Sequence, residues 1–453
     1  MKNEMYPTKT NNTGTGGSSF SHTSKIIVLI VATFASFMTP FDSSIVNLAI
    51  PSIGKDLGGN IELLGWIPIA YLMALSIFFI PFGRLADIHG RKLIFVLGIS
   101  TFVEGSLACS LSPSLPLLIA FRFIQGLGSA MMGGTAIALI TSVFPPGERG
   151  KALGINTAAV YVGLSLGPPL GGFLVQYLGW RSIFYVNIPI GIIVIILTLI
   201  KIHEKNYIKD EKFDHIGFML YFPSLTLIFL GLTLLQHTFA NEILIIGILI
   251  LPLFFTYEYY VSHPLIDVEL FKNLTFTFSN ITALLNYSST YAISFIMSLY
   301  LQLILKLDPQ YTGLILLSQP LLMAIFSPFG GWLSDKIEPR IIASIGMALI
   351  SVSILRLSFL NINTSILDIV SWLMILGFGY ALFSSPNTNA VMSSVERTKY
   401  GIASGILGTM RFTGQALSLA ITVSIFSTIT RTVITTTGNL QRRSRKPMIL
   451  IMG

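Results

Sequence analysis

Charged residues are scarce in this sequence. Asp, Glu, Lys and Arg make up 11% of the 453 residues, whereas hydrophobic residues make up 53%. Soluble domains carry about 25% charged residues, so this composition indicates a protein that crosses a membrane many times. The net charge of +8 is not the footprint of a nucleic-acid-binding protein, because the basic residues stand singly between hydrophobic runs. We therefore expect no nucleic-acid partner.

The chain also lacks the residue patterns of catalytic and cofactor sites. Its single cysteine, Cys109, excludes an intramolecular disulfide and a cysteine-based metal cluster. The Gly-rich segment 14–17 lacks the Lys of a phosphate-binding loop, and Gly126-Leu127-Gly128 follows no strand pattern, so neither is a nucleotide site. We predict no enzymatic activity, no cofactor and no metal.

Hydrophobic segments of about 20 residues, the length that spans a bilayer, recur along the chain. They predict thirteen membrane-spanning helices, at 25–48, 61–82, 92–111, 115–143, 152–176, 182–201, 213–236, 241–261, 274–304, 311–330, 341–360, 366–391 and 401–430. Residues 1–24 are rich in Ser, Thr, Asn and Gly, so we expect a disordered cytoplasmic tail there.

The distribution of Lys and Arg predicts how these helices are oriented. With the N-terminus in the cytoplasm, the outer connections up to residue 430 contain only Lys55, Arg181 and Lys306 as basic residues. An excess of basic residues marks the cytoplasmic side, so we predict a protein of the cell membrane with a cytoplasmic N-terminus. The chain after residue 430 breaks this pattern, because it should emerge outside and yet is basic between 442 and 446. We interpret this as a last helix lost by truncation or a frameshift, with a genuine odd-numbered topology as the alternative.

A charged stretch between the second and third predicted helices carries the clearest motif. It reads Gly83-Arg84-Leu85-Ala86-Asp87-Ile88-His89-Gly90-Arg91-Lys92, the pattern G-x-L-x-D-x-x-G-R-K. Its spacing recurs after the tenth predicted helix at Gly331, Asp335 and Arg340. Such an internal repeat predicts two similar halves related by an axis along the membrane normal. The alternative is a polar loop whose basic residues only hold it in the cytoplasm.

This motif resembles the signature of the major facilitator superfamily, and three further segments resemble signatures of its fourteen-helix drug:proton antiporters. They read Phe41-Asp42-Ser43-Ser44-Ile45-Val46-Asn47-Leu48-Ala49-Ile50-Pro51 in the first helix, Arg122-Phe123-Ile124-Gln125-Gly126-Leu127-Gly128 in the fourth, and Gly163-Leu164-Ser165-Leu166-Gly167-Pro168-Pro169-Leu170-Gly171-Gly172 in the fifth. Ser44 and Ile50 are mild departures from the Thr and Leu of the family pattern. The antiporter-type motif of the fifth helix consists of Gly163, Gly167, Pro168, Gly171 and Gly172, whose small residues let another helix approach closely.

The resemblance implies an all-α polytopic membrane protein with the major facilitator fold. The expected fold has two six-helix bundles, at 25–201 and 274–430, with two extra central helices within 202–273. Members of this branch usually have fourteen helices, so the resemblance also implies that the last helix is missing, that the second bundle is incomplete, and that 431–453 is a basic tail.

Ionisable groups inside a bilayer are costly and are candidates for function. Asp42, Arg122 and Glu104 fall at similar depths in the first, fourth and third predicted helices. We hypothesise that Asp42 takes up and releases the coupling proton, that Arg122 modulates it, and that Glu104 is a further candidate. The alternatives are a permanent structural ion pair and a Glu104 that pairs with Arg122 or faces the interface. Arg411 and Arg356 are interpreted as structural.

The resemblance implies a latch at the cytoplasmic ends of the helices. Asp87 and Asp335 would each meet the N-terminus of a helix of the opposite half, near Gly401 and Lys151, where a helix dipole stabilises a carboxylate by about 0.3–2 kcal/mol. The remaining residues of this inner gate are Gly83, Gly90, Arg91, Lys92, Gly331 and Arg340. The alternative is local pairing of Asp87 with Arg84 or Arg91.

The candidate substrate contacts are polar and aromatic residues of the first, fourth and ninth helices. They are Ser43, Asn47, Gln125, Asn280, Tyr287 and Tyr291. Aromatic and amide groups suit amphipathic or cationic organic molecules, although a stripe of this kind also arises from helix packing.

The function that the resemblance implies is proton-coupled export of drug-like amphipathic or cationic compounds by alternating access. The expected partners are a small-molecule substrate, protons and the lipid bilayer, and we expect a monomer. The alternatives are an exporter of one metabolite, such as an amino acid, a siderophore or a sugar, and a non-transporting or decayed membrane protein.

Overall fold

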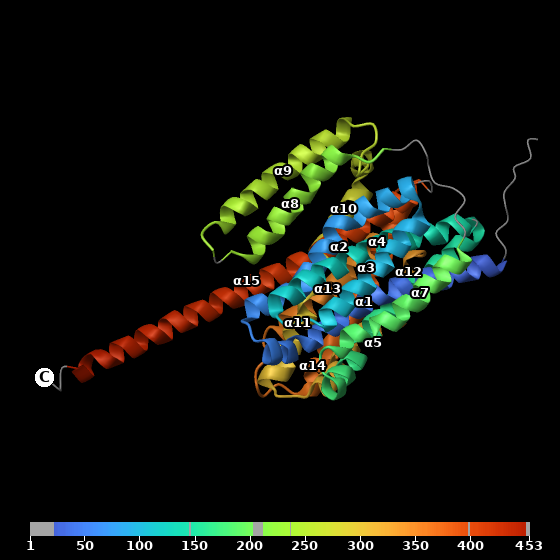
Figure 1. The fold of residues 1–453 in the computed structure, drawn as a ribbon. Helices are drawn as coiled ribbons and strands as arrows, with labels where there is room; N and C mark the ends of the chain where they lie inside the picture. Colours follow the sequence, from blue (N-terminus) through green and yellow to red (C-terminus); the bar gives the residue numbers. More distant parts are fainter. Residues whose placement is uncertain (1–21, 145, 203–211, 236, 397–398, 450–453) are drawn as a thin grey trace, which may run out of the picture.

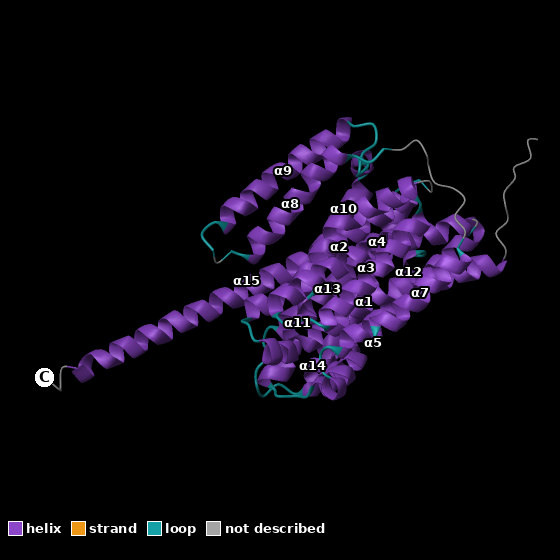
Figure 2. Cartoon of the chain, in the orientation of Figure 1, coloured by secondary structure: helices purple, strands orange, loops and turns teal. Residues whose placement is uncertain are grey.

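The computed structural model of the protein describes residues 22–144, 146–202, 212–235, 237–396 and 399–449, and every regular element in these ranges is a helix (Figure 2). In chain order the elements are α1 (His22–Leu57), α2 (Ile61–His89), α3 (Arg91–Ser110), α4 (Leu115–Val143), α5 (Pro146–Leu178), α6 (Ser182–Tyr185), α7 (Asn187–Lys201), α8 (His215–Thr233), α9 (Ala240–Tyr260), η1 (Val268–Lys272), α10 (Leu274–Thr290), α11 (Ala292–Leu299), η2 (Tyr300–Ile304), α12 (Pro309–Ser334), α13 (Pro339–Leu357), α14 (Ile366–Ser393) and α15 (Tyr400–Ile449). Of the tail expected at 1–24, residues 1–21 lie outside the described residues, and α1 already begins at His22.

The thirteen segments that the sequence predicts are all present as helical rods. Within the described ranges, eleven are long and apolar enough to cross a membrane. The other two are α15 and the interrupted rod α10–α11–η2. The interruption follows three hydroxyl side chains, Ser288, Ser289 and Thr290, each of which donates a hydrogen bond to the carbonyl four residues earlier. Such bonds compete with the regular ladder and bend helices.

The rods form two bundles with a hairpin beside them. α1–α7 make the first half and α10–α15 the second, while α8 and α9 lie side by side at the edge (Figure 1). α8 packs against α2 of the first half and α15 of the second. The halves meet along α5 and α12, along α2 and α15, and along α1 and α11. This confirms the two bundles and the two extra helices expected from the sequence.

The bundle has two ends that can be named by their residues. The loop end carries the two repeated motifs, at 83–92 and 331–340, where α2 and α12 finish. The far end carries the end of α5 and the start of α12, which touch there. The two halves of the internal repeat therefore lie at the same end of the bundle.

α15 is longer than the sequence predicts. We expected the helix to end near residue 430 and a basic tail to follow, but α15 continues to Ile449. Its C-terminal part extends away from the bundle (Figure 1). Between 431 and 439 the sequence is rich in Thr and contains Val433, Gly438 and Asn439, all weak helix formers, so helix propensity does not account for this length.

The stretch 83–92 is less of a loop than expected. α2 runs through to His89 and α3 starts at Arg91, so Gly90 alone separates the two helices. Gly90 has φ +106°, a conformation that residues with a Cβ rarely adopt. Its N–H donates to the carbonyl of Ala86 and thus ends α2. The glycine of the motif is therefore required by the backbone itself.

We expect Gly90→Ala to destabilise this turn by about 1–3 kcal/mol, the usual cost of a residue held in a sparsely populated backbone region. Thermal unfolding of the purified protein in detergent should start several degrees lower. Gly154→Ala is the matched control, because Gly154 lies within α5 and a Cβ there would meet nothing within 4 Å. Equal melting temperatures for the two variants would contradict the requirement.

Candidate functional site

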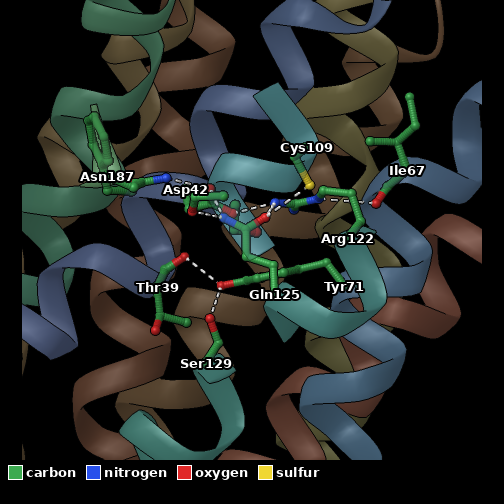
Figure 3. A network of polar contacts seen from close by, with 12 residues as sticks. Thr39, Asp42, Ile67, Tyr71, Cys109, Arg122, Gln125, Ser129 and Asn187 are labelled. Carbon is green, nitrogen blue, oxygen red and sulfur yellow. Dashed lines mark hydrogen bonds and ion pairs between the residues drawn. The ribbon is translucent and has the colours of Figure 1, made fainter. Parts of the chain in front are cut away.

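A buried polar network surrounds Asp42 in the first half. Arg122 Nη1 lies 2.6 Å from Asp42 Oδ2, and both side chains have no exposed surface. The other carboxylate oxygen, Oδ1, accepts hydrogen bonds from Gln125 Nε2 at 2.9 Å and from Asn187 Nδ2 at 2.8 Å. Figure 3 shows these four side chains facing one another. The carboxylate is therefore both ion-paired and fully hydrogen-bonded.

The guanidinium of Arg122 is held from several sides. Its Nη1 also donates to Gln125 Oε1 at 2.5 Å, and its Nε donates to the backbone carbonyl of Ile67 at 3.4 Å. The guanidinium lies 4.2 Å from the centre of the Tyr71 ring, a cation–π distance. One nitrogen, Nη2, is buried and has no hydrogen-bond partner. The positive charge of Arg122 is thus stabilised by a carboxylate and an aromatic ring, and only its Nη2 lacks a hydrogen-bond acceptor.

Five helices meet at this pair: α1, α2, α3, α4 and α7. α3 contributes Ser106, which accepts from Gln125 at 2.7 Å, and α2 contributes Tyr71, whose hydroxyl is 2.7 Å from that of Ser129. Two charges removed from water are costly, and their attraction offsets the cost only when the remaining donors and acceptors are satisfied. The convergence of five helices supplies most of those partners, and Arg122 Nη2 and Asn187 Oδ1 remain without one. Any change in charge at Asp42 therefore reaches most of the first half.

The third candidate of the sequence analysis is not in the network. Glu104 is exposed on α3, whereas its neighbours Gly105 and Ser106 face the network. Counting residues along the helix predicts the depth of Glu104 in the membrane but not the side of α3 to which its side chain points. Conversely, Gln125 was expected to touch substrate and is instead part of the network, and Asn187 was missed. Asn187 is a lone amide in the apolar run of α7, and that is the signal that could have found it.

The network adjoins a contact between the two halves. Ser43, next to Asp42 on α1, shares a short hydrogen bond with the Tyr291 hydroxyl at the start of α11. One turn further, Ser298 donates to the carbonyl of Asn47 at 2.8 Å. Gln302 donates to the carbonyl of Leu48 at 3.1 Å. These contacts close the seam between α1 and α11 toward the far end.

The glycine motif of α5 closes a second seam there. A Cβ at Gly163, Gly167 or Gly171 would collide with Phe37, Ser44 or Ile45 of α1, so α5 and α1 lie in backbone contact. A Cβ at Gly172 would lie 2.4 Å from the carbonyl oxygen of Pro309, the first residue of α12. In return, a Cβ at Gly313 would lie 2.2 Å from the carbonyl oxygen of Pro168. The motif therefore joins α5 to both halves.

The loop end is arranged differently. A Cβ at Gly154 of α5, or at Gly401 or Gly405 of α15, would meet nothing within 4 Å, so open space adjoins these two helices. These glycines are less closely packed than those of the α5 motif, as are Gly58 and Gly179 at the far-end termini of α1 and α5.

The gate residues pair within their own halves in this conformation. Asp87 forms an ion pair with Arg91 at 2.9 Å, the local pairing that the sequence analysis kept as an alternative. Asp335 accepts from Asn389 at 3.4 Å, and Arg340 pairs with Glu338 at 3.2 Å. Lys92 donates a hydrogen bond to the carbonyl of Leu199. Gly83 lies near the carbonyl of Gly134, and Gly331 lies near the hydroxyl of Ser385.

The remaining substrate candidates lie in three different places. Asn280 is buried and donates to the carbonyl of Phe276 within its own helix. Tyr287 lies at the centre of the second half, where Arg411 is 5.6 Å from the centre of its ring. Tyr291 belongs to the seam described above.

A family model described as Major Facilitator Superfamily matches residues 32–419. The chain belongs to the major facilitator superfamily. It is therefore a multi-pass membrane transporter of small molecules, and its family consists of transporters rather than enzymes.

Curated relatives agree with this assignment. The riboflavin transporter RibZ of Clostridioides difficile is 33% identical over 408 residues, which are 89% of this chain and 88% of RibZ. The multidrug resistance protein Stp of Mycobacterium tuberculosis is 32% identical over 412 residues, 89% of this chain and 76% of Stp. Among solved structures, a bacterial homologue of the human lysosomal transporter Spinster, in an inward-facing conformation, has a TM-score of 0.67 at 18% identity, covering 93% of this chain and 86% of that one. The resemblance seen in the motifs is thus confirmed for the family and the fold.

Removing the charge of Asp42 alone should destabilise this transporter. Asp42→Asn leaves Arg122 buried without a counter-charge, and breaking a buried ion pair from one side costs about 3–5 kcal/mol. The double variant Asp42→Asn/Arg122→Gln removes both charges and should recover most of the lost stability. Thermal unfolding in detergent measures both. A double variant less stable than Asp42→Asn would show that the pair is not the unit of stability.

Proposed function

We propose that this transporter exports drug-like amphipathic organic molecules in exchange for protons, and that Asp42 is the carboxylate that binds the proton. The observation that carries the proposal is the position of Asp42: it is buried where five helices meet, and its neighbour Ser43 contacts Tyr291 of the other half. An ionisable group inside a membrane protein that touches the moving interface is a candidate for coupling.

The coupling step follows from the charges. Protonation of Asp42 removes the negative charge that holds Arg122, and it changes the carboxylate's hydrogen bonds with Gln125 and Asn187. The helix that carries Asp42 also carries Ser43, Asn47 and Leu48, which bind the other half toward the far end. A shift of α1 therefore loosens the far-end seam. The ionised pair belongs to the state with that seam closed, which is the state described above.

In this scheme the two ends open alternately. The loop end faces the cytoplasm and admits substrate while Asp42 is ionised. Protonation from outside accompanies opening of the far end and release of substrate. Asp42 releases this proton to the cytoplasm when the loop end opens again. When the far end opens, the loop end closes, and Asp87 and Asp335 then leave their present partners for the helix starts of the opposite halves. A membrane potential contributes about 2.3 kcal/mol per proton charge per 100 mV.

The substrate range is supported by the relatives. Stp and MdtP, the second from Bacillus subtilis and 30% identical over 394 residues, are named as multidrug transport proteins. One observation favours a narrower range, because RibZ is named for a single metabolite. A panel of unrelated dyes separates the two: export of several favours a multidrug transporter, and export of none of them favours a single-metabolite exporter. One chain contributes both halves, so we propose that the monomer acts alone.

Dye efflux from cells tests the coupling. The wild-type chain should expel dye until an uncoupler collapses the proton gradient. Asp42→Asn and Asp42→Asn/Arg122→Gln should both lose uncoupler-sensitive efflux, the second without loss of folded protein. Glu104→Gln is the matched control, because Glu104 is exposed and outside the network. Full efflux by the folded double variant would refute Asp42 as the coupling group.

Cysteine labelling tests the orientation. The native Cys109 is buried and gives little background. A membrane-impermeant maleimide should label Asn363→Cys, exposed at the far end, in intact cells. It should label His89→Cys, exposed at the loop end, only after permeabilisation. The reverse pattern would place the loop end outside and overturn the direction of transport.

A further inference from the structure

A second arginine lies in the middle of the protein. Arg411 is on α15, eleven residues after its start at Tyr400, which is about 16 Å along a helix that rises 1.5 Å per residue. That distance is about half the thickness of the hydrocarbon core. Its neighbours on α15 face different helices, since Gly408 meets Phe79 of α2 and Gly414 meets Leu284 and Tyr287 of α10. The side chain of Arg411 lies between these two contacts.

Arg411 differs from the other arginines in its partners. In the described part of the chain it forms no ion pair, whereas five others do: Arg91, Arg122, Arg181, Arg340 and Arg356. Its Nη2 donates to the hydroxyl of Thr388 at 3.3 Å, and its Nε is buried with no hydrogen-bond partner. A mid-membrane cation with no counter-charge is costly to keep. Its presence calls for an anion that the described residues do not supply.

Three tyrosines gather near this cation. Arg411 lies 5.6 Å from the centre of the Tyr287 ring, and Tyr161 and Tyr380 pack in the same cluster as Tyr287. The rings of Tyr287 and Tyr380 are 5.8 Å apart between centres. Tyr161 comes from α5 of the first half and is 3.3 Å from Ser384 of the second. The cluster therefore spans both halves, as a site that both ends can reach in turn must do.

The cluster is not completely enclosed. Arg411 is partly exposed, whereas Arg122 is not exposed at all. Asp42, by contrast, already binds Arg122, Gln125 and Asn187 through its carboxylate.

We propose that Arg411, with Tyr161, Tyr287 and Thr388, forms a subsite for the acidic group of an aromatic substrate. The guanidinium binds an ionised carboxylate or a similar anionic group, and the tyrosine rings pack against the planar part of the molecule. The subsite repels a lipophilic cation, which revises the expectation from sequence that cations are suitable substrates. The inference rests on the proposed transport function and names the substrate class that this function serves.

Equilibrium binding to the purified full-length protein tests the subsite. The probes are nalidixate, an aromatic carboxylate, its neutral ethyl ester, and the cation ethidium, each titrated by calorimetry in detergent at mildly alkaline pH. The wild-type protein should bind nalidixate about tenfold or more tightly than the ester, the usual gain from hydrogen bonds to a charged group. Binding of ethidium should be weaker than that of either.

Variants assign the preference to Arg411. Arg411→Gln should bind both nalidixate and the ester with the affinity that the wild type has for the ester, and Arg411→Lys should keep part of the preference. Arg356→Gln is the matched control, because Arg356 is paired with Asp368 at the far end. Removing an uncompensated buried cation should leave the melting temperature of Arg411→Gln unchanged or raised. A lowered one would assign Arg411 to structural support and overturn the proposal.

Other outcomes also decide. The proposal would be overturned if the wild-type protein bound ethidium more tightly than nalidixate, or bound neither the acidic nor the neutral probe. It would also be overturned if Arg411→Gln kept the preference for the carboxylate over the ester. These titrations need no proton gradient. Loss of the proposed proton coupling would therefore leave the carboxylate preference in place, and loss of the preference would leave uncoupler-sensitive efflux in place, so the two failures are distinguishable.

Discussion

The ion pair between Asp42 and Arg122 is the interaction on which the rest of the first half depends. Two opposite charges with no exposed surface are tolerable only if every neighbouring group supports them. Gln125, Asn187 and Ser106 do so from three helices, and the Tyr71 ring covers the guanidinium. We propose that the same arrangement makes the half sensitive to a single proton.

The pair acts on a molecule whose halves are joined unequally at the two ends. Toward the far end, glycines bring α5 against α1 and α12, and the Ser43–Tyr291 contact ties α1 to α11. Toward the loop end, space adjoins Gly154, Gly401 and Gly405. The second arginine, Arg411, lies beside Thr388 and Tyr287 of the second half. Asp42 neutralises Arg122, and we propose that Arg411 binds an anionic group of the substrate.

The sequence predicted the parts of this arrangement that depend on rare residues and on length. Asp42 and Arg122 could be found because charges within hydrophobic runs are few, and the thirteen rods because their lengths match a bilayer. The rotation of each helix about its axis was not predictable, because it depends on packing between helices. For this reason Glu104 was expected near Arg122 but is exposed, and Asn187 was missed. Arg411 was interpreted as structural, since a sequence does not show whether a carboxylate lies near.

The central claim is that the protonation state of Asp42 sets which end is open. Distances between spin labels at Lys55→Cys and Asn363→Cys report this directly. Both residues are exposed at the far end, Lys55 in the last turn of α1 and Asn363 in the connection between α13 and α14. In the wild-type chain the long-distance population should grow as the pH falls, and in Asp42→Asn it should be large at every pH. A distance distribution that ignores pH in the wild type, or that still responds to pH in Asp42→Asn, would contradict the account.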